Sequence, residues 1–516
     1  MSELGFWKLA TQYPDRIALV TQDGTRVRAG DLLARSNQLV HGLRRLGLAQ
    51  GDVVATLLPN DQPMIELYLA ATQAGLYLVP INHHLAAPEI AYILGDSSAK
   101  AFVADARFAD AAATAATEAG MPATGCFAVG TIAGFRPYAA LTDGTPTTPP
   151  DERAAGQVMN YTSGTTGRPK GVRRALMPFD PDTVGSMFAM FLSMFGITPE
   201  GDGVHLVGSP LYHTAVLVFA GCSLHFGHTL SVMDKWTPQD SLAVIERDRV
   251  TTTHMVPTQF HRLLALPDDV KGKHDVSSLR HVVHAAAPCP VDVKRRMLAW
   301  WGPVIYEYYA ASEGGGTLVT PGEWLERPGT VGKAWASSEI RILDDAGEPL
   351  PIGTPGTVFM KLGVQDFEYH GDKKKTDANR RDGFFTVGDV GYLDDAGYLF
   401  LCDRKIDMII SGGANIYPTE VEACLLSHPK VGDAAVFGIP DDDWGEQVKA
   451  VVEPAPGVTA SPALADDILA FCVERIAKFK CPKSIDFIAE LPRDPNGKLY
   501  KRKLRDPYWQ GRERAI

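Results

Sequence analysis

The sequence predicts an α/β protein with a large N-terminal domain and a small α+β C-terminal domain. In the first half, short β-type runs alternate with helical stretches, which is typical of βαβ units and doubly wound sheets. The chain has 516 residues, 45% of them hydrophobic, and single cores stop growing near about 250–300 residues. A fresh pattern of glycine turn, helix and strand begins after Ile406. More than one domain is therefore expected.

The N-terminal half supplies the elements of a mostly parallel sheet. Apolar runs at 53–58, 76–81 and 101–105 are predicted strands, and "MIELYLAATQAG" between the first two is a predicted helix. The same alternation resumes at 157–162, 251–257 and 281–290. Strands of this kind bind ligands in the crevice at their carboxyl ends, so the site is expected there.

An antiparallel, β-barrel-like subdomain is predicted to close the large domain. "GTVFMKLG" is followed by "GFFTVGDVGYLDDAGYLFLCDRK", in which Asp-Asp-Ala-Gly reads as the turn between two alternating strands. The predicted organisation is a large domain at 1–403, a hinge at 404–407 and a small domain at 408–516.

Composition excludes several classes of protein. The formal net charge is −11, which disfavours binding to nucleic acid, so the expected partners are small molecules. Seven cysteines are scattered without a C-x-x-C pair, which argues against a disulfide framework or a zinc site. The N-terminus lacks a signal-peptide pattern, and no apolar run is long enough to span a membrane. A cytoplasmic protein is expected.

Two basic runs, "DKKKTDANRR" and "KRKLR", are interpreted as solvated faces. Weak contact of these runs with a membrane surface or with the phosphates of CoA stays open as an alternative, and so does a homodimer.

The stretch "NYTSGTTGRPKG" at 160–171 is predicted to bind phosphate. Glycines let backbone N–H groups turn toward an anion, hydroxyls add donors and a lysine adds charge; the residues are Thr162, Ser163, Gly164, Thr165, Thr166, Gly167, Lys170 and Gly171. A polar turn between two strands is the plainer alternative. The stretch does not match the P-loop pattern G-x-x-x-x-G-K-[ST], and this disfavours a P-loop kinase or GTPase.

This loop closely resembles the signature of the adenylate-forming superfamily, which includes acyl-CoA synthetases, luciferases and peptide-synthetase adenylation domains. Companion motifs follow in the family's order, from "YPDRIALV" to Leu504: "SPLYHTA", "HAAAPCP", "YEYYAASEGG", "FFTVGDVGYLD", "CDRKID", "SGGANI" and "LPRDPNGKLYKRKL". The resemblance implies an enzyme that uses ATP and Mg²⁺ and whose small C-terminal domain is mobile.

The resemblance also implies roles for individual residues. Lys498 would be catalytic, reaching the carboxylate and the α-phosphate, and Glu313 would hold Mg²⁺ with Ser312 nearby in place of the usual threonine. The resemblance assigns further residues to contacts with adenine (Tyr309, Ala286, Ala287, Pro288) and with ribose (Asp389, Arg404). It assigns others to the acyl pocket (His213, Ala310), to the CoA tunnel (Gly412, Gly413) and to the hinge (Lys405, Ile406). The residue about which the hinge rotates is usually Asp or Lys in the family, whereas this chain has Ile406 at that position. Lys405 or Asp407 is therefore an alternative pivot.

The predicted function is ATP-dependent activation of a carboxylic acid to an acyl-adenylate, followed by transfer to CoA. Ala310 stands where acetyl-specific relatives carry an indole, which favours a medium- or long-chain fatty acid. An aryl-CoA ligase, a ligase that loads a carrier protein, and a non-enzymatic nucleotide or acyl-adenylate sensor are the alternatives. Met187, Met190 and Met194 are expected to be ordinary core, with an adaptable lipid channel as the alternative.

Overall fold

This computed structural model describes residues 4–162, 169–199, 201–311, 315–362, 368–369, 380–493 and 499–510. It divides into two compact units. The first comprises the described residues between 1 and 255, 266 and 283, and 366 and 378; the second comprises those between 256 and 265, 284 and 365, and 379 and 516.

One sheet of the first unit is parallel throughout. Its strands follow the order β7-β6-β5-β3-β4-β8, with bounds β3 (Val53–Leu57), β4 (Tyr77–Pro80), β5 (Ala99–Asp105), β6 (Cys126–Val129), β7 (Arg136–Pro137) and β8 (Gln157–Val158). The strands predicted at 53–58, 76–81 and 101–105 are β3, β4 and β5, so these predictions are confirmed.

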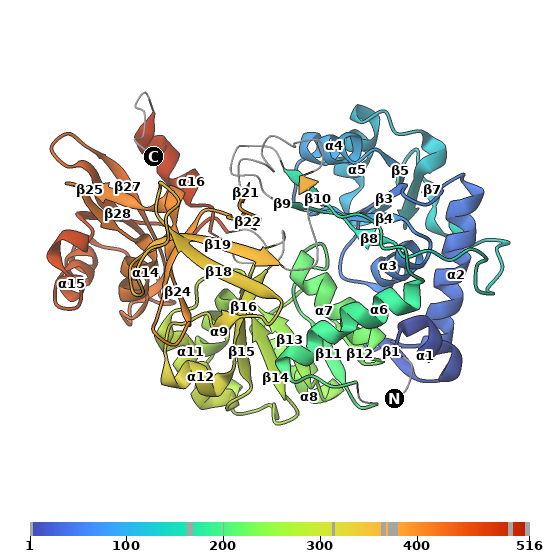
Figure 1. Ribbon diagram of the computed structural model, residues 1–516, viewed down its shortest axis with the longest axis horizontal. Helices are drawn as coiled ribbons and strands as arrows, with labels where there is room; N and C mark the ends of the chain where they lie inside the picture. Colours follow the sequence, from blue (N-terminus) through green and yellow to red (C-terminus); the bar gives the residue numbers. More distant parts are fainter. Residues whose placement is uncertain are drawn as a thin grey trace. The chain divides into compact units, whose positions relative to one another are not determined.

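Helices cover both faces of this sheet, as Figure 1 shows. One face packs against α2 (Ala29–Arg45) and α3 (Gln62–Gln73), and the other against α4 (Ala87–Asp96) and α5 (Ala109–Glu118). The helix predicted at 64–75 corresponds to α3. Every residue of β3 is buried, which explains why this strand reads as a continuous apolar run rather than an alternating one.

The other elements of the first unit surround a second sheet. Parallel strands β13, β11, β12 and β1 lie in that order, with β2 antiparallel at the edge. Their bounds are β1 (Ile17–Val20), β2 (Arg26–Arg28), β11 (Val204–Val207), β12 (Thr229–Val232) and β13 (Thr252–Met255), and the helices are α1 (Phe6–Gln12), α6 (Pro181–Ala189), η4 (Met190–Phe195), α7 (Thr214–His225), α8 (Pro238–Asp248) and α10 (Asp268–Lys271). A small antiparallel sheet joins β9 (Asn160–Thr162), β10 (Lys170–Arg173) and β20 (Glu368–Tyr369).

The second unit begins with antiparallel strands. The described ones are β15 (Ile305–Ala310), β16 (Gly316–Val319), β17 (Lys333–Ala334), β18 (Ser338–Leu343), β19 (Gly356–Leu362), β21 (Arg380–Arg381), β22 (Phe384–Phe385), β23 (Asp389–Leu393) and β24 (Leu399–Arg404), with helices α9 (Pro257–Leu264), α11 (Val291–Trp301) and α12 (Pro321–Glu326). Gly397 N donates to Asp394 O at 3.0 Å in the turn between β23 and β24. The predicted hairpin with its Asp-Asp-Ala-Gly turn is confirmed.

The C-terminal elements form an α+β arrangement. The sheet runs β26-β25-β28-β27, with β29 parallel to β28. The bounds are η5 (Lys405–Asp407), β25 (Ile409–Ser411), β26 (Ala414–Ile416), α14 (Pro418–Leu426), β27 (Val431–Asp441), β28 (Gly445–Pro454), α15 (Pro462–Val473), β29 (Ser484–Phe487), α16 (Lys501–Arg505) and η7 (Asp506–Trp509). The predicted α/β fold class with a smaller α+β C-terminal part is confirmed. The boundary at 404–407 stays a prediction.

Two interpretations of the sequence are wrong. Met187, Met190 and Met194 are exposed and are not core. Their near-helical spacing put them on one side of α6 and η4, but that side lies outward while Ala189, Leu192 and Phe195 are buried. In the run 501–505, the cations of Lys501 and Arg505 form ion pairs with little exposed surface, so this run is not a fully solvated face.

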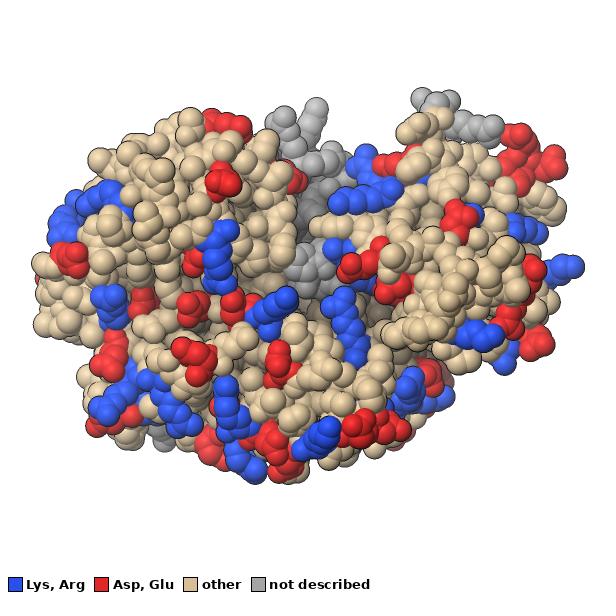
Figure 2. All heavy atoms as spheres, turned by 180° about the vertical axis from the view of Figure 1, so that it is seen from behind, with Lys and Arg blue, Asp and Glu red and all other residues tan. Residues whose placement is uncertain are grey.

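Surface charge is mixed on the face in Figure 2, where acidic and basic side chains are interspersed. Among the helices that the structure describes, none combines the length and the apolar composition needed to cross a bilayer.

Candidate nucleotide and acyl-transfer site

Several predicted site residues lie outside the described ranges. These are Ser163, Gly164, Thr165, Thr166 and Gly167 of the glycine loop, Ser312, Glu313 and Lys498, together with the side chain of Thr162. Their assigned roles stay predictions.

The two ends of the glycine loop are held by a β-hairpin. Strands β9 and β10 pair antiparallel, with Thr162 opposite Lys170 and Tyr161 opposite Gly171. The Tyr161 hydroxyl donates to the Asp96 carboxylate at 2.6 Å, which ties the hairpin to α4. Gly171 has no room for a side chain without movement, since a Cβ would lie 3.0 Å from Cζ of Tyr161. The hairpin therefore fixes where the predicted phosphate loop leaves and rejoins the first unit.

One of the predicted adenine residues, Tyr309, forms a connected cluster with the predicted ribose residues in the second unit. The Tyr309 hydroxyl donates to Asp389 Oδ2 at 2.6 Å, and Arg404 Nε lies 3.5 Å from Asp389 Oδ1. Asp389 begins β23 and pairs in register with Arg404 at the end of β24, so the ladder itself sets their separation. The direct Tyr309–Asp389 bond was missed from sequence, because the two residues lie 80 positions apart and were assigned to different parts of the nucleotide.

The predicted adenine loop leaves β14 (His281–His284) with an unusual backbone. Ala286 has φ of +75°, a left-handed conformation that costs an alanine roughly 1–2 kcal/mol. Ala286 and Pro288 are exposed, and Ala287 is half-buried. Strain of this kind concentrates at binding sites, which supports the predicted role of the loop.

Behind β15 lies a buried charged cluster that the sequence analysis missed. Lys294 Nζ on α11 donates to Glu307 Oε2 at 2.6 Å, and His284 Nε2 lies 3.4 Å from the same oxygen. Lys294 Nζ also sits 4.8 Å from the centroid of the Trp324 ring. Burial raises the pKa of Glu307. The only signal in the sequence was a glutamate placed among tyrosines in "YEYY", two residues before Tyr309 on the same strand.

The predicted acyl-site residues fall in different units. His213 is the N-cap of α7 in the first unit and its ring lies 4.3 Å from that of Tyr212. Burial, together with the charges of His83 and His254, lowers the pKa of His213 to about 3. A neutral imidazole is therefore expected near pH 7. Ala310 ends β15 opposite Gly316 and is half-buried.

The predicted CoA loop is a tight hairpin turn. Gly412 and Gly413 have φ of +57° and +80° and join β25 to β26, as a type I′ turn requires. The indole of Trp444 packs on Gly412, where a Cβ would lie 2.3 Å from a ring carbon, and it is 61% exposed. Trp444 was not singled out from sequence, because its contact depends on the β27–β28 turn reaching back to residue 412.

The predicted hinge residues form the short helix η5. Lys405 pairs with Asp345, and Asp407 pairs with Arg505, while Ile406 between them is 41% exposed. Both alternative pivots are thus held by ion pairs.

A metal site is not formed by the residues that the structure describes. Within 4–162, 169–199, 201–311, 315–362, 368–369, 380–493 and 499–510, no group of three or more His, Cys, Asp or Glu side chains could hold an ion. The predicted Mg²⁺ ligand Glu313 lies outside these ranges.

Known proteins match this chain over nearly its whole length. The model of the AMP-binding enzyme family matches residues 6–363, and that of the AMP-binding enzyme C-terminal domain matches residues 420–498. A fatty acid–[acyl-carrier-protein] ligase, ScoC of Streptomyces coeruleorubidus, is 31% identical over 98% of this chain and 96% of its own. A feruloyl-CoA synthase of an Amycolatopsis species is 34% identical over 97% and 98%.

A solved structure also matches this chain over nearly its whole length. The amide bond synthetase McbA of Marinactinospora thermotolerans has a TM-score of 0.82 with 27% identity, over 98% of this chain and 99% of its own. These comparisons confirm the predicted class, an AMP-forming acid–thiol ligase, without selecting its acid. The chain belongs to the AMP-binding enzyme family, the adenylate-forming superfamily that its motifs predict.

Proposed function

We propose that this protein activates a medium- or long-chain fatty acid with ATP and transfers the acyl group to CoA. A carboxylate oxygen attacks the α-phosphorus of ATP, and the bond to pyrophosphate breaks as the acyl-adenylate forms. The CoA thiolate then attacks the acyl carbon, and AMP leaves with the former carboxylate oxygen. The observation that carries this proposal is the Tyr309–Asp389–Arg404 cluster, in a chain of the AMP-binding enzyme family.

Each proposed residue has a separate task. The Asp389 carboxylate accepts hydrogen bonds from the ribose hydroxyls, and the Tyr309 ring packs on adenine. Lys498 stabilises the negative charge that develops around the α-phosphorus and is the group whose loss is expected to slow adenylation most. Bound Mg²⁺, held by Glu313, would neutralise phosphate oxygens.

The choice of acid rests on Ala310. Ala310 stands at the end of β15, where the resemblance places an indole in acetyl-specific relatives, and this supports an acid longer than acetate. The feruloyl-CoA synthase relative keeps an aryl acid as the second candidate, and the carrier-protein ligase relative keeps a carrier thiol as the second acceptor.

A carboxylate panel separates these possibilities. Pyrophosphate release is measured with acetate, octanoate, dodecanoate, palmitate, benzoate and ferulate, each without acceptor, with CoA and with a purified acyl carrier protein. The proposal expects the highest turnover with octanoate, dodecanoate or palmitate, and a thioester only with CoA. A preference for ferulate or benzoate would replace the fatty acid, and a thioester only on the carrier protein would replace CoA.

Removing the Tyr309 hydroxyl is expected to weaken ATP binding. Tyr309→Phe leaves Asp389 Oδ2 without the donor it has now, and a hydrogen bond to a charged group contributes about 1.5–3 kcal/mol. The KM for ATP should rise about tenfold while the KM for the acid is unchanged, in steady-state assays of pyrophosphate release. Tyr308→Phe, on the neighbouring residue whose side chain leaves the opposite face of β15, is the control and should leave both values unchanged. Equal effects of the two variants would count against a nucleotide-positioning role.

Adding a methyl group to the predicted CoA loop is expected to harm only the second half-reaction. Gly412→Ala strains a residue at φ +57° and pushes against the Trp444 ring. The KM for CoA should rise, whereas pyrophosphate release without CoA stays at the wild-type rate. Gly457→Ala, at another positive-φ glycine with no atom within 4 Å of the added carbon, controls for backbone strain. A fall in acceptor-free pyrophosphate release would contradict the assignment of this turn to CoA.

A further inference from the structure

One carboxylate oxygen of Glu307 meets the residues at both ends of the predicted adenine loop. This loop runs from the end of β14 to the start of α11, so that His284 precedes it and Lys294 follows it in the first turn of the helix. Lys294 Nζ lies 2.6 Å from Glu307 Oε2, and His284 Nε2 lies 3.4 Å from the same oxygen. The carboxylate therefore joins the two ends of the loop through side chains, in addition to the backbone between them.

The same glutamate belongs to the strand that carries Tyr309. In the antiparallel ladder of β15 and β16, Glu307 pairs with Val319 and Tyr309 pairs with Thr317. Successive side chains of a strand alternate between its two faces, so Glu307 and Tyr309 leave the same face of β15. A side chain that binds Glu307 is therefore tied to the strand face that also carries Tyr309, whose hydroxyl donates to Asp389 at 2.6 Å.

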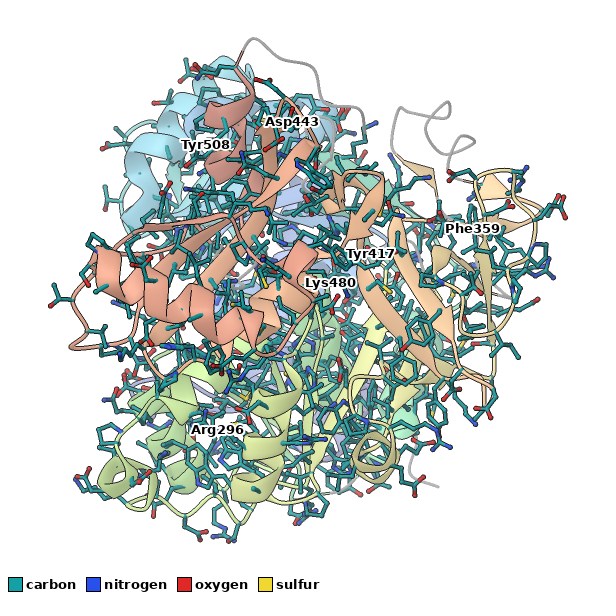
Figure 3. The ribbon with its side chains drawn as sticks, turned by 90° about the vertical axis from the view of Figure 1, so that its left-hand side faces the viewer. Arg296, Phe359, Tyr417, Asp443, Lys480 and Tyr508 are labelled. Carbon is teal, nitrogen blue, oxygen red and sulfur yellow. The ribbon has the colours of Figure 1, made fainter. Side chains whose placement is uncertain are left out.

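The cluster of His284, Lys294 and Glu307 lies in the interior of the second unit. The side chains of His284 and Lys294 are fully buried, and that of Glu307 is nearly so. Arg296, labelled in Figure 3, lies two residues beyond Lys294 on α11 and is 54% exposed, so the helix turns one cation inward and the other outward. A buried ion pair often stabilises a fold no better than well-packed apolar residues of similar volume. Stability alone therefore does not account for these charges.

The loop between the two ends has a backbone that needs support. Ala286 has φ of +75°, and a strained residue persists only where its surroundings hold it in place. Burial raises the pKa of the Cys289 thiol, and the carboxylate of Glu307 raises it further, so the charge of the cluster also reaches the residue after Pro288. The chain on both sides of the strained alanine thus lies near Glu307.

We propose that His284, Lys294 and Glu307 are positioning residues for the base of the nucleotide. Their shared contact at Glu307 Oε2 fixes both ends of the 285–290 loop relative to β15, so that the loop and the Tyr309 ring are preorganised for adenine. The three side chains act through the loop and the strand and not by contact with ATP. The inference rests on the proposed function, in which the Tyr309 ring packs on adenine. Loosening the cluster should weaken nucleotide binding and leave binding of the acid unchanged.

The contact of His284 with Glu307 is tested by two substitutions of different chemistry. His284→Phe keeps an aromatic ring beside Phe260, whose ring centroid lies 5.1 Å from that of His284, but it removes the nitrogen near Glu307. His284→Gln places an amide nitrogen near the position of Nε2. Calorimetric titration with AMP should give a Kd raised about tenfold in His284→Phe, or about 1.4 kcal/mol, and within about twofold of the wild type in His284→Gln. Unchanged AMP binding in His284→Phe, or equal losses in both variants, would overturn the proposal.

The Lys294–Glu307 pair is tested by removing both charges together. Lys294→Met with Glu307→Leu replaces the ion pair by apolar side chains, a change that buried pairs often tolerate without loss of stability. The Kd for AMP should rise about tenfold, while the urea midpoint stays near that of the wild type. Arg296→Met removes an exposed cation from the same helix and should change neither value. Wild-type affinity in a folded double variant would contradict the proposal, and if the double variant does not fold, the two His284 variants decide.

Steady-state kinetics distinguish positioning from a general loss of structure. A smaller fraction of folded protein lowers the apparent kcat but moves no KM, whereas a displaced loop raises the KM for ATP. In pyrophosphate release with the acid preferred in the panel, His284→Phe should raise the KM for ATP about tenfold and leave the KM for the acid unchanged. A fall in kcat with both KM values unchanged would show a structural role only.

The outcomes also separate this inference from the proposed function. AMP binding is measured without an acid or CoA, so it does not depend on finding the substrate. A wild-type protein that binds AMP but releases no pyrophosphate with any acid of the panel would overturn the proposed function alone. A wild-type protein that binds no AMP would overturn both.

Discussion

Replacing Lys498 by alanine is expected to lower ATP–pyrophosphate exchange by about 10²–10³-fold, a loss of about 2.7–4 kcal/mol of transition-state stabilisation. The reason is that negative charge grows around the α-phosphorus as the carboxylate attacks, and a positioned ammonium group stabilises this charge more than it stabilises bound ATP. Thioester formation from the prepared acyl-adenylate should stay near the wild-type rate, because Lys498 is proposed to act on the attack at the α-phosphorus and not on thiolysis at the acyl carbon. The KM for ATP should change less than kcat.

A nearby lysine provides the control for this prediction. Lys503 is exposed on α16 and its amine lies 4.8 Å from the centroid of the Tyr500 ring, so Lys503→Ala removes the same charge five positions away. It should leave exchange unchanged. Exchange that survives Lys498→Ala at the level of Lys503→Ala would show that this chain adenylates without Lys498, and the glycine-loop residue Lys170 would then be the next candidate.

Lowering the pH from 7 to 5 is expected to destabilise the first unit by about 8 kcal/mol. Four of its histidines are buried and have low pKa values because burial disfavours the charged ring: His205 and His213 at about 3, and His225 and His254 at about 4. In the unfolded chain a histidine has a pKa of about 6.5, so the unfolded state binds more protons below that pH. Each group costs about 1.36 kcal/mol per pH unit between about 6.5 and 5, or about 2 kcal/mol.

The sign of this effect distinguishes it from ordinary acid denaturation. Stability from these histidines is fully present above about pH 6.5 and falls continuously toward pH 4, whereas carboxylates with lowered pKa values act only at lower pH. Urea unfolding at pH 7, 6 and 5 measures it. His254→Gln removes one titrating group and should reduce the loss between pH 7 and 5 by about 2 kcal/mol. Equal urea midpoints for the wild-type protein at pH 7 and pH 5 would show that these rings are protonated in the folded protein.

Local patterns were sufficient to predict much of the fold. The apolar runs that form β3, β4 and β5 are continuous because both faces of their sheet are covered. The Asp-Asp-Ala-Gly turn between β23 and β24 was predictable because its residue types favour a turn, which is closed by the hydrogen bond from Gly397 N to Asp394 O. Periodicity was insufficient at α6 and η4. It placed Met187, Met190 and Met194 on one face, but which face packs inward depends on α7 and α1, which lie elsewhere in the chain.

The site was predictable as a set of motifs but not as a network. Asp389 and Tyr309 were both singled out, yet the hydrogen bond between them depends on how β15 meets β23. The Lys294–Glu307 pair with His284 joins α11, β15 and β14, and nothing within any one of these segments marks the charges as buried. Lys501 and Arg505 looked like solvated bases for the same reason. Their acidic partners lie far upstream in the chain, Glu422 in α14 for Lys501 and Asp407 in η5 for Arg505.

The most direct test of the central claim follows an oxygen atom. The preferred acid is labelled with ¹⁸O in both carboxylate oxygens and incubated with ATP, Mg²⁺, CoA and the protein, and the products are analysed by mass spectrometry. Attack of the carboxylate on the α-phosphorus, followed by thiolysis at the acyl carbon, predicts AMP that carries one ¹⁸O atom together with unlabelled pyrophosphate. Unlabelled AMP, or label in inorganic phosphate formed with ADP, would contradict an acyl-adenylate intermediate.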